Sequence, residues 1–460
     1  MLYSILKRII RYALKGYFKS IVILGKENIP KTGGTIYIVN HPSALLDPLM
    51  IATLVSPKFH FIAAAEYFGK GFVKWLLTSQ FNMIPVYRPE MYEGEKVDND
   101  AMFRDCYTCL EHGGSIMIFP EGNSVTEKRL RPLKTGTIRI YRGAKSNLGP
   151  DHQINIIPIG LNYTNPHKFQ SRAVINIGKP IDLETLEVDH LDEKAQIQAQ
   201  TAILEDKLRD QILHIENYAL APMISDVDQV YKFNLWNDFG VTKKQNRRKL
   251  GLQQEIINAV DYFNTHSPDT IDRLKQKITT YFDLLGELNL NNDVLNKKVS
   301  RTVLLMVLII LSPVFLIGYL INSIPFYLTR GYFNKNFSHR LNDPTNEQSI
   351  APQFKGTVIF SIGTLVFLFW YLIVATIAGI VGPWWMGVIA FILCYLSGRG
   401  TLYYLTIANY LKQKWKLWRA KSNEKNRYDK LLDIHQQILN ELNQFKETYL
   451  NEVVNVQEQE

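Results

Sequence analysis

The stretch TIYIVNHP (residues 35–42) joins a run of β-branched and aromatic residues to a polar pair, Asn40 and His41, and to a proline. Such a run is typical of a buried strand that ends where the polar residues begin. The stretch SIMIFPEG (residues 115–122) has the same form. Similar runs lie at 59–62, 83–86, 154–159 and 173–177, with helix-length segments between them at about 43–55, 66–80, 98–112 and 134–147. This alternation predicts an α/β domain over residues 21–182, a mixed sheet flanked by helices.

The polar groups that follow two of these strands are suited to chemistry. His41 is followed by Asp47, with five residues between them. A neutral histidine can take a proton from a hydroxyl, and a carboxylate can fix its tautomer and stabilise the imidazolium. In the second stretch, Gly122 permits a tight turn whose N–H groups can bind an oxyanion or a phosphate. Either motif alone is also compatible with an ordinary structural turn.

Together, Asn40-His41…Asp47 and the later Phe119–Gly122 resemble the first and third sequence blocks of the phospholipid/glycerol acyltransferase family. Ile84–Arg88 is similar to the second block, which combines apolar residues with an arginine, and Ile157–Gly160 is similar to the fourth. Lys134 lies between blocks three and four, where members of the family commonly have a lysine and glycine element. The resemblance covers about residues 20–185.

This resemblance implies an acyl transfer with two catalytic residues. His41 would deprotonate a glycerol hydroxyl that attacks an acyl thioester, and Asp47 would orient His41. The thiol would leave as coenzyme A or acyl carrier protein, with no metal and no further cofactor. Arg88 and the turn at Glu121-Gly122 would bind the phosphate of the acceptor, because a guanidinium matches phosphate oxygens. The implied substrate-binding residues are Asn40, Arg88, Glu121, Gly122, Ser124, Lys134 and Pro158.

The spacing between His41 and Asp47 departs from the commonest family pattern, which has four intervening residues instead of five. The longer spacing resembles the fungal glycerol-3-phosphate/dihydroxyacetone-phosphate acyltransferase branch, whose members also carry membrane segments after the catalytic domain. We therefore expect glycerol 3-phosphate as the acceptor, with lysophosphatidate (1-acylglycerol 3-phosphate) as the alternative. A catalytically silent lipid-binding or scaffold protein with the same fold is a further alternative.

The composition favours anionic partners. The chain has 460 residues and a formal net charge of +9. No nucleic-acid-binding motif accompanies this charge, and the basic residues gather beside apolar segments, so we expect anionic membrane lipids and not nucleic acid. The three cysteines do not indicate a disulfide framework, and the CxxC pair Cys106 and Cys109 is expected to be packed inside a helix. His41 and Asp47 together with His60 could suggest a metal site, but no further ligands cluster with them, so no metal is expected.

The last third of the chain is strongly apolar. Val303–Leu328 and Thr357–Gly398 contain no charged residue, and Gly382-Pro383 divides the second of these. Such lengths predict membrane insertion over residues 301–411, in two to four spans. Leu402–Leu411 could extend the last helix, and the first segment could be a hairpin broken at Pro313.

The remaining segments place the domain relative to a membrane. Residues 1–20 predict a basic amphipathic interfacial helix, residues 183–300 a helical region with a loop at about 225–240, and residues 412–460 a polar basic tail. Positive charge beside a span favours the cytoplasmic side. We therefore expect an integral protein of the bacterial inner membrane or the endoplasmic reticulum, with its catalytic domain in the cytoplasm. Domain and tail on one side require an even number of crossings, which conflicts with three apolar segments.

Overall fold

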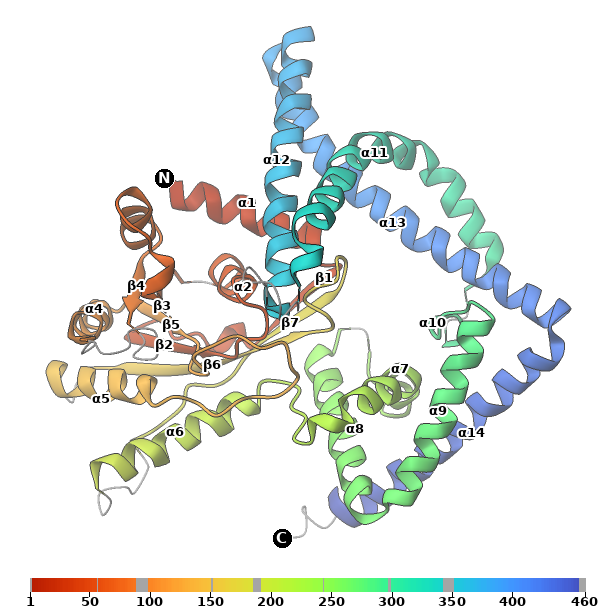
Figure 1. Ribbon diagram of the computed structural model, residues 1–460, viewed down its shortest axis with the longest axis horizontal. Helices are drawn as coiled ribbons and strands as arrows, with labels where there is room; N and C mark the ends of the chain where they lie inside the picture. Colours follow the sequence, from red (N-terminus) through yellow and green to blue (C-terminus); the bar gives the residue numbers. More distant parts are fainter. Residues whose placement is uncertain are drawn as a thin grey trace. The chain divides into compact units, whose positions relative to one another are not determined.

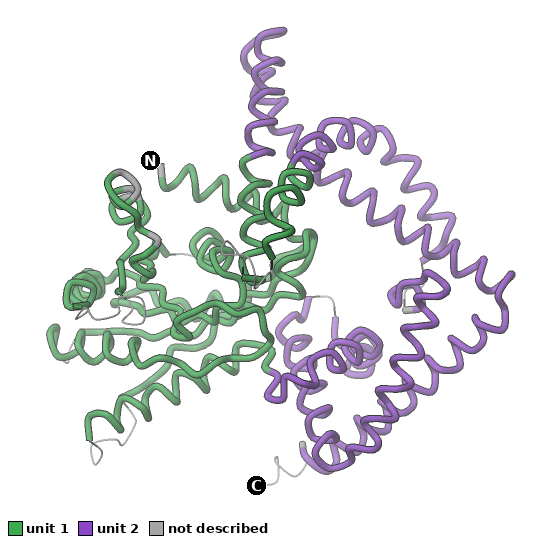
Figure 2. The backbone as a smooth tube through the Cα atoms, viewed as in Figure 1, with its two compact units in different colours: residues 1–214, 329–365 green, residues 215–328, 366–460 purple. Residues whose placement is uncertain are grey.

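The computed structural model describes residues 2–55, 57–87, 98–149, 152–184, 192–242, 244–296, 299–341 and 351–454 (Figure 1). The chain forms two compact units, coloured separately in Figure 2. Unit 1 contains residues 1–214 and 329–365, and unit 2 contains residues 215–328 and 366–460. Arg88 lies outside the described residues.

Unit 1 is built on one seven-stranded sheet, in the order β1-β7-β6-β2-β5-β3-β4. All neighbouring strands are parallel except β6 and β7, which are antiparallel. The central strand β2 sets the register, with Tyr37 opposite Met117 on one side and Ile157 on the other. The strands are β1 (Ser20–Leu24), β2 (Gly34–Val39), β3 (Phe59–Ala64), β4 (Met83–Val86), β5 (Ser115–Ile118), β6 (Ile154–Tyr163) and β7 (Arg172–Ile177).

Helices cover both faces of this sheet, and each face has its own apolar core (Figure 1). One core includes Leu14 of α1, Met50 of α2 and Phe360 of α12 (Lys355–Val381), and the other includes Leu110 of α4, Ile138 of α5 and Leu204 of α6. The predicted mixed α/β sheet flanked by helices is thus confirmed. The helices that flank the sheet from the first part of this unit are α1 (Leu2–Tyr17), α2 (Leu46–Leu54), α4 (Asp100–Glu111), α5 (Gly136–Leu148) and α6 (Glu193–Arg209).

Two features of unit 1 differ from the sequence prediction. Strand β1, at the edge of the sheet, was not predicted. The continuous helix predicted at 66–80 is wrong: the chain forms a 3-10 turn (Ala65–Tyr67), the short α3 (Phe72–Trp75) and a π-helical turn (Leu76–Gln80). Gly69 and Gly71, both at φ +59, interrupt the segment, because left-handed residues cannot continue a right-handed helix.

The polar part of unit 2 is helical. Its helices are α7 (Ala221–Asp238), α8 (Asn246–His266), α9 (Pro268–Glu287), the short α10 (Asp293–Asn296) and α14 (Lys425–Tyr449). The predicted loop at 225–240 is therefore wrong. Its Asp and Asn residues suggested a loop, but Val227, Val230 and Leu235 of the same segment are buried at helical spacing. The domain boundaries read from the sequence stay predictions.

Three helices in the described ranges are long and apolar enough to cross a membrane. They are α11 (Arg301–Asn336), α12 (Lys355–Val381) and α13 (Trp384–Asn423). A hairpin broken at Pro313 is wrong, because α11 runs through Pro313 and Pro325 without interruption. The extension of the last helix through Leu402–Leu411 is confirmed.

A buried amide joins the apolar helices inside unit 2. Asn322 of α11 accepts a hydrogen bond from the Tyr371 hydroxyl of α12 at 2.6 Å and donates to the Cys394 carbonyl of α13 at 3.3 Å. A polar side chain among apolar helices is costly unless it is bonded, so these contacts fix which faces of the three helices meet.

Candidate active site

The two predicted catalytic side chains meet at the end of the central strand. β2 ends at Val39, His41 lies in the loop that follows, and Asp47 is the second residue of α2. His41 Nδ1 lies 2.8 Å from Asp47 Oδ2. The Asp47 side chain is fully buried, whereas the His41 side chain is 18% exposed. An ionised carboxylate only accepts hydrogen bonds, so Nδ1 carries the proton and Nε2 keeps the lone pair that can take a proton from a substrate.

The loop between them absorbs the extra residue in its backbone. Ala44 has φ +40, in the left-handed region that favours glycine. The Ser43 carbonyl accepts from the Leu46 N–H at 3.0 Å, and the Ala44 carbonyl accepts from the Asp47 N–H at 3.3 Å. This tight turn returns the chain toward His41, so that Asp47 reaches the imidazole despite the five intervening residues.

The Asp47 carboxylate is held by two further donors. The Ser43 N–H donates to Oδ2 at 2.7 Å, and the Tyr163 hydroxyl at the end of β6 donates to Oδ1 at 2.9 Å. Burial and the nearby Asp47 charge raise the pKa of Tyr163 well above its ordinary value, so Tyr163 remains a donor. The sequence reasoning missed Tyr163, which lies 116 residues from Asp47 and belongs to none of the motifs.

The loop after β5 lies along the catalytic loop, residues 40–45, and makes four hydrogen bonds to it. The His41 N–H donates to Glu121 Oε1 at 2.7 Å, and the Val125 N–H donates to the His41 carbonyl at 3.1 Å. The Ala44 N–H donates to Ser124 Oγ at 2.8 Å, and Thr126 Oγ1 donates to the Pro42 carbonyl at 2.7 Å. The two motifs singled out in the sequence therefore form one structure, in which residues 121–126 hold the backbone of residues 41–44.

Glu121 is bonded on both carboxylate oxygens. Oε1 accepts from His41, and Oε2 accepts from Arg131 Nε at 2.9 Å. Burial raises the pKa of Glu121 above its ordinary value, although the His41 N–H and Arg131 act in the opposite direction. Arg131 in turn donates to the Asn123 side chain. A contact of Glu121 with the acceptor stays a prediction, and the geometry gives it a bracing role.

An aromatic ring fixes the plane of the imidazole. Phe119, the first residue after β5, stacks on His41 with ring centroids 4.1 Å apart and an interplanar angle of 22°. Stacking on one face and the Asp47 bond at one edge restrict both rotatable bonds of the side chain. His41 is thereby held in one orientation before a substrate arrives.

Two of the predicted substrate-binding residues lie inside the fold. Asn40 clamps the end of β2 to β6, donating to the Leu161 carbonyl at 3.1 Å and accepting from the Leu161 N–H at 2.6 Å. Pro158 is buried within β6, opposite Ile38 of β2. These contacts align the strand that carries His41, and a contact of either residue with substrate stays a prediction.

The remaining predicted residues concern the phosphate. Gly122 has φ +80, and a Cβ built on it would lie 2.7 Å from Lys134 Cε, so the lysine side chain passes directly over this turn. The Lys134 N–H also donates to the Pro120 carbonyl at 2.8 Å. Gly122 and Lys134 are thus brought together, whereas the prediction for Arg88 falls outside the described residues.

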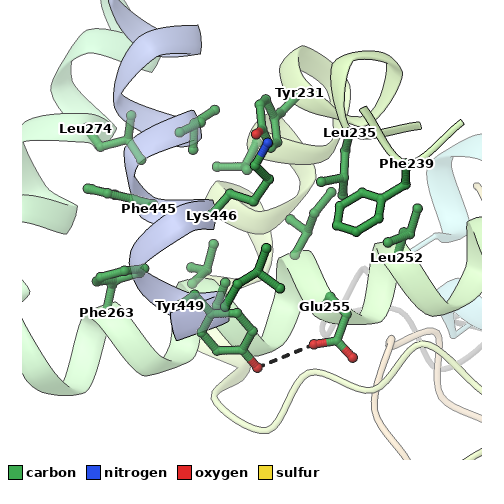
Figure 3. A pocket seen from close by; sticks show the side chains of 16 residues that line it. Tyr231, Leu235, Phe239, Leu252, Glu255, Phe263, Leu274, Phe445, Lys446 and Tyr449 are labelled. Carbon is green, nitrogen blue, oxygen red and sulfur yellow. Dashed lines mark hydrogen bonds between the residues drawn. The ribbon is translucent and has the colours of Figure 1, made fainter. Parts of the chain in front are cut away.

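Other candidate features have structural surroundings. Cys106 and Cys109 are buried in α4, and burial raises their thiol pKa values to about 12 and about 11. No cluster of three or more His, Cys, Asp or Glu side chains that could hold a metal ion occurs within the described ranges. In unit 2, a cavity between α7, α8, α9 and α14 is lined mainly by apolar side chains, with Glu255 bonded to Tyr449 at 3.4 Å (Figure 3). It is a gap in helix packing.

Comparisons with known proteins relate the part of the chain that holds this site to acyltransferases. Residues 20–162 match the acyltransferase family model. Two glycerol-3-phosphate O-acyltransferases of Saccharomyces cerevisiae are 41% identical over 88 residues and 38% identical over 87 residues, each covering 19% of this chain and 12% of the relative. An uncharacterised acyltransferase of Schizosaccharomyces pombe is 28% identical over 218 residues, which is 46% of this chain and 31% of the relative.

Among solved structures, the 1-acyl-sn-glycerophosphate acyltransferase of Thermotoga maritima aligns with 20% identity and a TM-score of 0.30, covering 44% of this chain and 78% of that one. The chain spans only 12–31% of the length of the curated relatives it matches. The family match covers the sheet from β1 to β6 and includes His41, Asp47 and the loop that braces them. The segment from residue 20 to residue 162 is a domain of the acyltransferase family.

Proposed function

We propose that this chain transfers a fatty acyl group from a thioester donor, acyl-CoA or acyl carrier protein, to a hydroxyl of glycerol 3-phosphate. The observation that carries the proposal is the bond between His41 and the fully buried Asp47 inside an acyltransferase-family domain. A buried carboxylate behind a partly exposed imidazole is the arrangement that a general base requires.

The reaction needs no group beyond the two substrates and this pair. His41 Nε2 takes the proton of the acceptor hydroxyl as its oxygen attacks the thioester carbonyl. The carbon–sulfur bond of the resulting tetrahedral intermediate then breaks, and the imidazolium returns the proton to the departing thiolate. Asp47 stabilises the imidazolium between these steps, because its charge is buried and close. An ester and a free thiol are the products.

The acceptor phosphate would bind beside the Gly122 turn. Lys134 supplies positive charge over this turn, and Arg88 is proposed to supply more. Glycerol 3-phosphate is favoured over lysophosphatidate because two relatives with about 40% identity in the domain are named glycerol-3-phosphate O-acyltransferases. A catalytically silent protein is disfavoured because the bonds that hold His41 and Asp47 are all in place.

We further propose that the domain and the basic tail both face the cytoplasm. This requires an even number of membrane crossings. We propose that α12 and α13 cross as a hairpin that turns at Gly382-Pro383, and that α11, which contains two prolines, does not cross and stays on the cytoplasmic side of the membrane. In sealed vesicles, Lys179→Cys and Lys421→Cys should react alike with a membrane-impermeant maleimide. Opposite labelling of the two positions would refute this topology.

An acceptor panel tests the activity. The purified full chain in phospholipid nanodiscs is given labelled acyl-CoA or acyl carrier protein with glycerol 3-phosphate, dihydroxyacetone phosphate or lysophosphatidate. We expect transfer to glycerol 3-phosphate, abolished by His41→Ala and preserved in His112→Ala, a matched change at an exposed histidine. Equal rates for the native chain and His41→Ala would refute the mechanism. Transfer to lysophosphatidate alone would refute glycerol 3-phosphate as the acceptor and identify lysophosphatidate in its place.

A further inference from the structure

A chain of three oriented hydrogen bonds connects the start of α12 to the loop that carries His41. The Gly356 N–H donates to His167 Nδ1 at 3.2 Å. His167 Nε2 lies 3.1 Å from Thr126 Oγ1, which donates to the Pro42 carbonyl at 2.7 Å. All these residues belong to unit 1. The last of these bonds ends on the residue next to the proposed general base.

Only one protonation state of His167 satisfies this chain. Nδ1 must be unprotonated because it accepts from a backbone N–H, so Nε2 carries the proton and donates to Thr126. Desolvation and the positive charge of Lys355 lower the pKa of His167, while the charge of Asp47 acts in the opposite direction. The Tyr17 hydroxyl, also facing this segment, donates to the Pro166 carbonyl at 3.1 Å. The surroundings therefore favour the neutral imidazole that the bonds require.

Packing at the first turn of α12 is as close as the hydrogen bonds suggest. A Cβ built on Gly356 would lie 2.6 Å from the Pro166 carbonyl oxygen, so this approach is open only to glycine. Thr357 Oγ1 donates to the Ser43 carbonyl at 3.4 Å. One turn later, Phe360 is 4% exposed and packs edge-on against Tyr17 with ring centroids 5.7 Å apart. Three successive contacts thus seat the helix on the catalytic loop and on α1.

We propose that the first turn of α12 is a latch, with His167 and Thr126 as positioning residues, that holds the His41 loop in its reactive geometry. The inference rests on the proposed function, because the geometry it protects is that of acyl transfer. Ala44 of the same loop adopts a left-handed conformation, which persists only when surrounding contacts impose it. The latch supplies two of those contacts, at the Pro42 and Ser43 carbonyls.

The latch makes a membrane helix part of the active site. Pro352–Val381 is one of the candidate membrane spans, and its first turn is the part that contacts the catalytic loop. Any displacement of α12 from unit 1 removes hydrogen bonds from residues 42 and 43. Acyl transfer is therefore coupled to the seating of this helix, so that the loop is held in place when the apolar helix occupies its membrane position.

Two pairs of matched variants test the latch in the full chain. Gly356→Ala introduces a Cβ against the Pro166 carbonyl, whereas Gly363→Ala makes the same change two turns later, where the nearest atom is Thr329 Cγ2 at 3.6 Å. Thr126→Val removes the hydroxyl that bonds Pro42, and Thr126→Ser restores it. For each variant, kcat and KM are measured in nanodiscs, together with hydrogen exchange of residues 40–47 and 122–128 and the thermal midpoint.

We expect Gly356→Ala and Thr126→Val to lower kcat about ten-fold with KM for both substrates unchanged. Thr126→Val removes the bond to the Pro42 carbonyl, and Gly356→Ala moves Thr357 away from the Ser43 carbonyl, so each costs the loop roughly one hydrogen bond. Exchange at residues 40–47 should rise by a similar factor, while Gly363→Ala and Thr126→Ser should match the native chain. Wild-type kcat and exchange in both Gly356→Ala and Thr126→Val would overturn the latch. If the native chain transfers no acyl group, the proposed function fails, and the exchange comparison still decides the latch.

Discussion

Replacement of Asp47 by asparagine isolates the charge of this residue from its geometry. The carboxylate accepts from three donors: His41 Nδ1 and the Ser43 N–H at Oδ2, and the Tyr163 hydroxyl at Oδ1. The amide oxygen of the introduced asparagine would occupy the Oδ2 position, because the Ser43 N–H cannot reverse its direction. The amide N–H would then face Tyr163, whose hydroxyl can rotate to accept. The His41 tautomer and its orientation are therefore expected to survive Asp47→Asn.

The expected loss can be worked from the distance. Nδ1 and Oδ2 are 2.8 Å apart, so the imidazolium formed during the reaction lies in contact with the buried carboxylate. For charges centred roughly 4 Å apart at an effective dielectric constant of about 20, the attraction is about 4 kcal/mol. His41 is 18% exposed, and water reduces this attraction. We expect kcat to fall by about two to three orders of magnitude with KM nearly unchanged, because the charge acts on the transition state.

The assay is initial-rate transfer of a labelled acyl group to glycerol 3-phosphate, with His41→Ala as the baseline and Asp105→Asn, at an exposed position on α4, as the matched control. Adding Tyr163→Phe to Asp47→Asn should lower kcat less than Tyr163→Phe does in the native chain, because its charged partner is gone. An Asp47→Asn rate within ten-fold of the native rate, with His41→Ala inactive, would refute the electrostatic role of Asp47.

Three further outcomes follow from the same geometry. Gly122→Ala should lower the free energy of unfolding by about 1–2 kcal/mol, measured by denaturant titration, because φ +80 suits only glycine, and should raise KM for the acceptor by displacing Lys134. Cys106 and Cys109, with thiol pKa values of about 12 and about 11, should resist iodoacetamide at pH 8 until the chain is unfolded; modification of the native chain would contradict their burial. The pKa of His167 is lower in the folded chain than in the unfolded chain, so its contribution to stability is present above about pH 6.5 and is lost as the pH falls through the folded value. Hydrogen exchange of residues 40–47 should therefore rise in mild acid, and less so in His167→Asn.

Much of the fold could be predicted because the strands are short apolar runs that end at turn residues. β2, β4 and β5 begin and end within one residue of the prediction. β1 carries the same local signal, an apolar run over Ser20–Leu24 that ends at Gly25, but it follows directly on the helix predicted at residues 1–20 and was not separated from it. The helix α7 was missed because its Asp and Asn content is typical of a loop, although its apolar residues recur at helical spacing.

The residues of the candidate site also fall into two groups, those that the sequence predicts and those that it does not. His41 and Asp47 could be predicted because a histidine and a carboxylate beyond a strand have recognisable chemistry. Tyr163, Thr126 and His167 could not, because they act through hydrogen bonds to backbone groups or to partners 41–116 residues away. A backbone carbonyl has no signature in the sequence. Residues that position a catalytic group are therefore harder to predict from the sequence than the catalytic residues themselves.

The five-residue spacing between His41 and Asp47 illustrates what such a departure can mean. The spacing suggested glycerol 3-phosphate as the acceptor. In the structure, the loop with five intervening residues contains a tight turn at Ala44, which has a left-handed φ. The histidine–carboxylate distance is still 2.8 Å, so the spacing leaves the geometry of proton transfer unchanged. The backbone at residues 42–44 of this longer loop is bonded to Ser124, Thr126 and Thr357. The longer loop thus bears on how the site is held, while the acceptor phosphate is proposed to lie beside Lys134, whose side chain passes over the Gly122 turn.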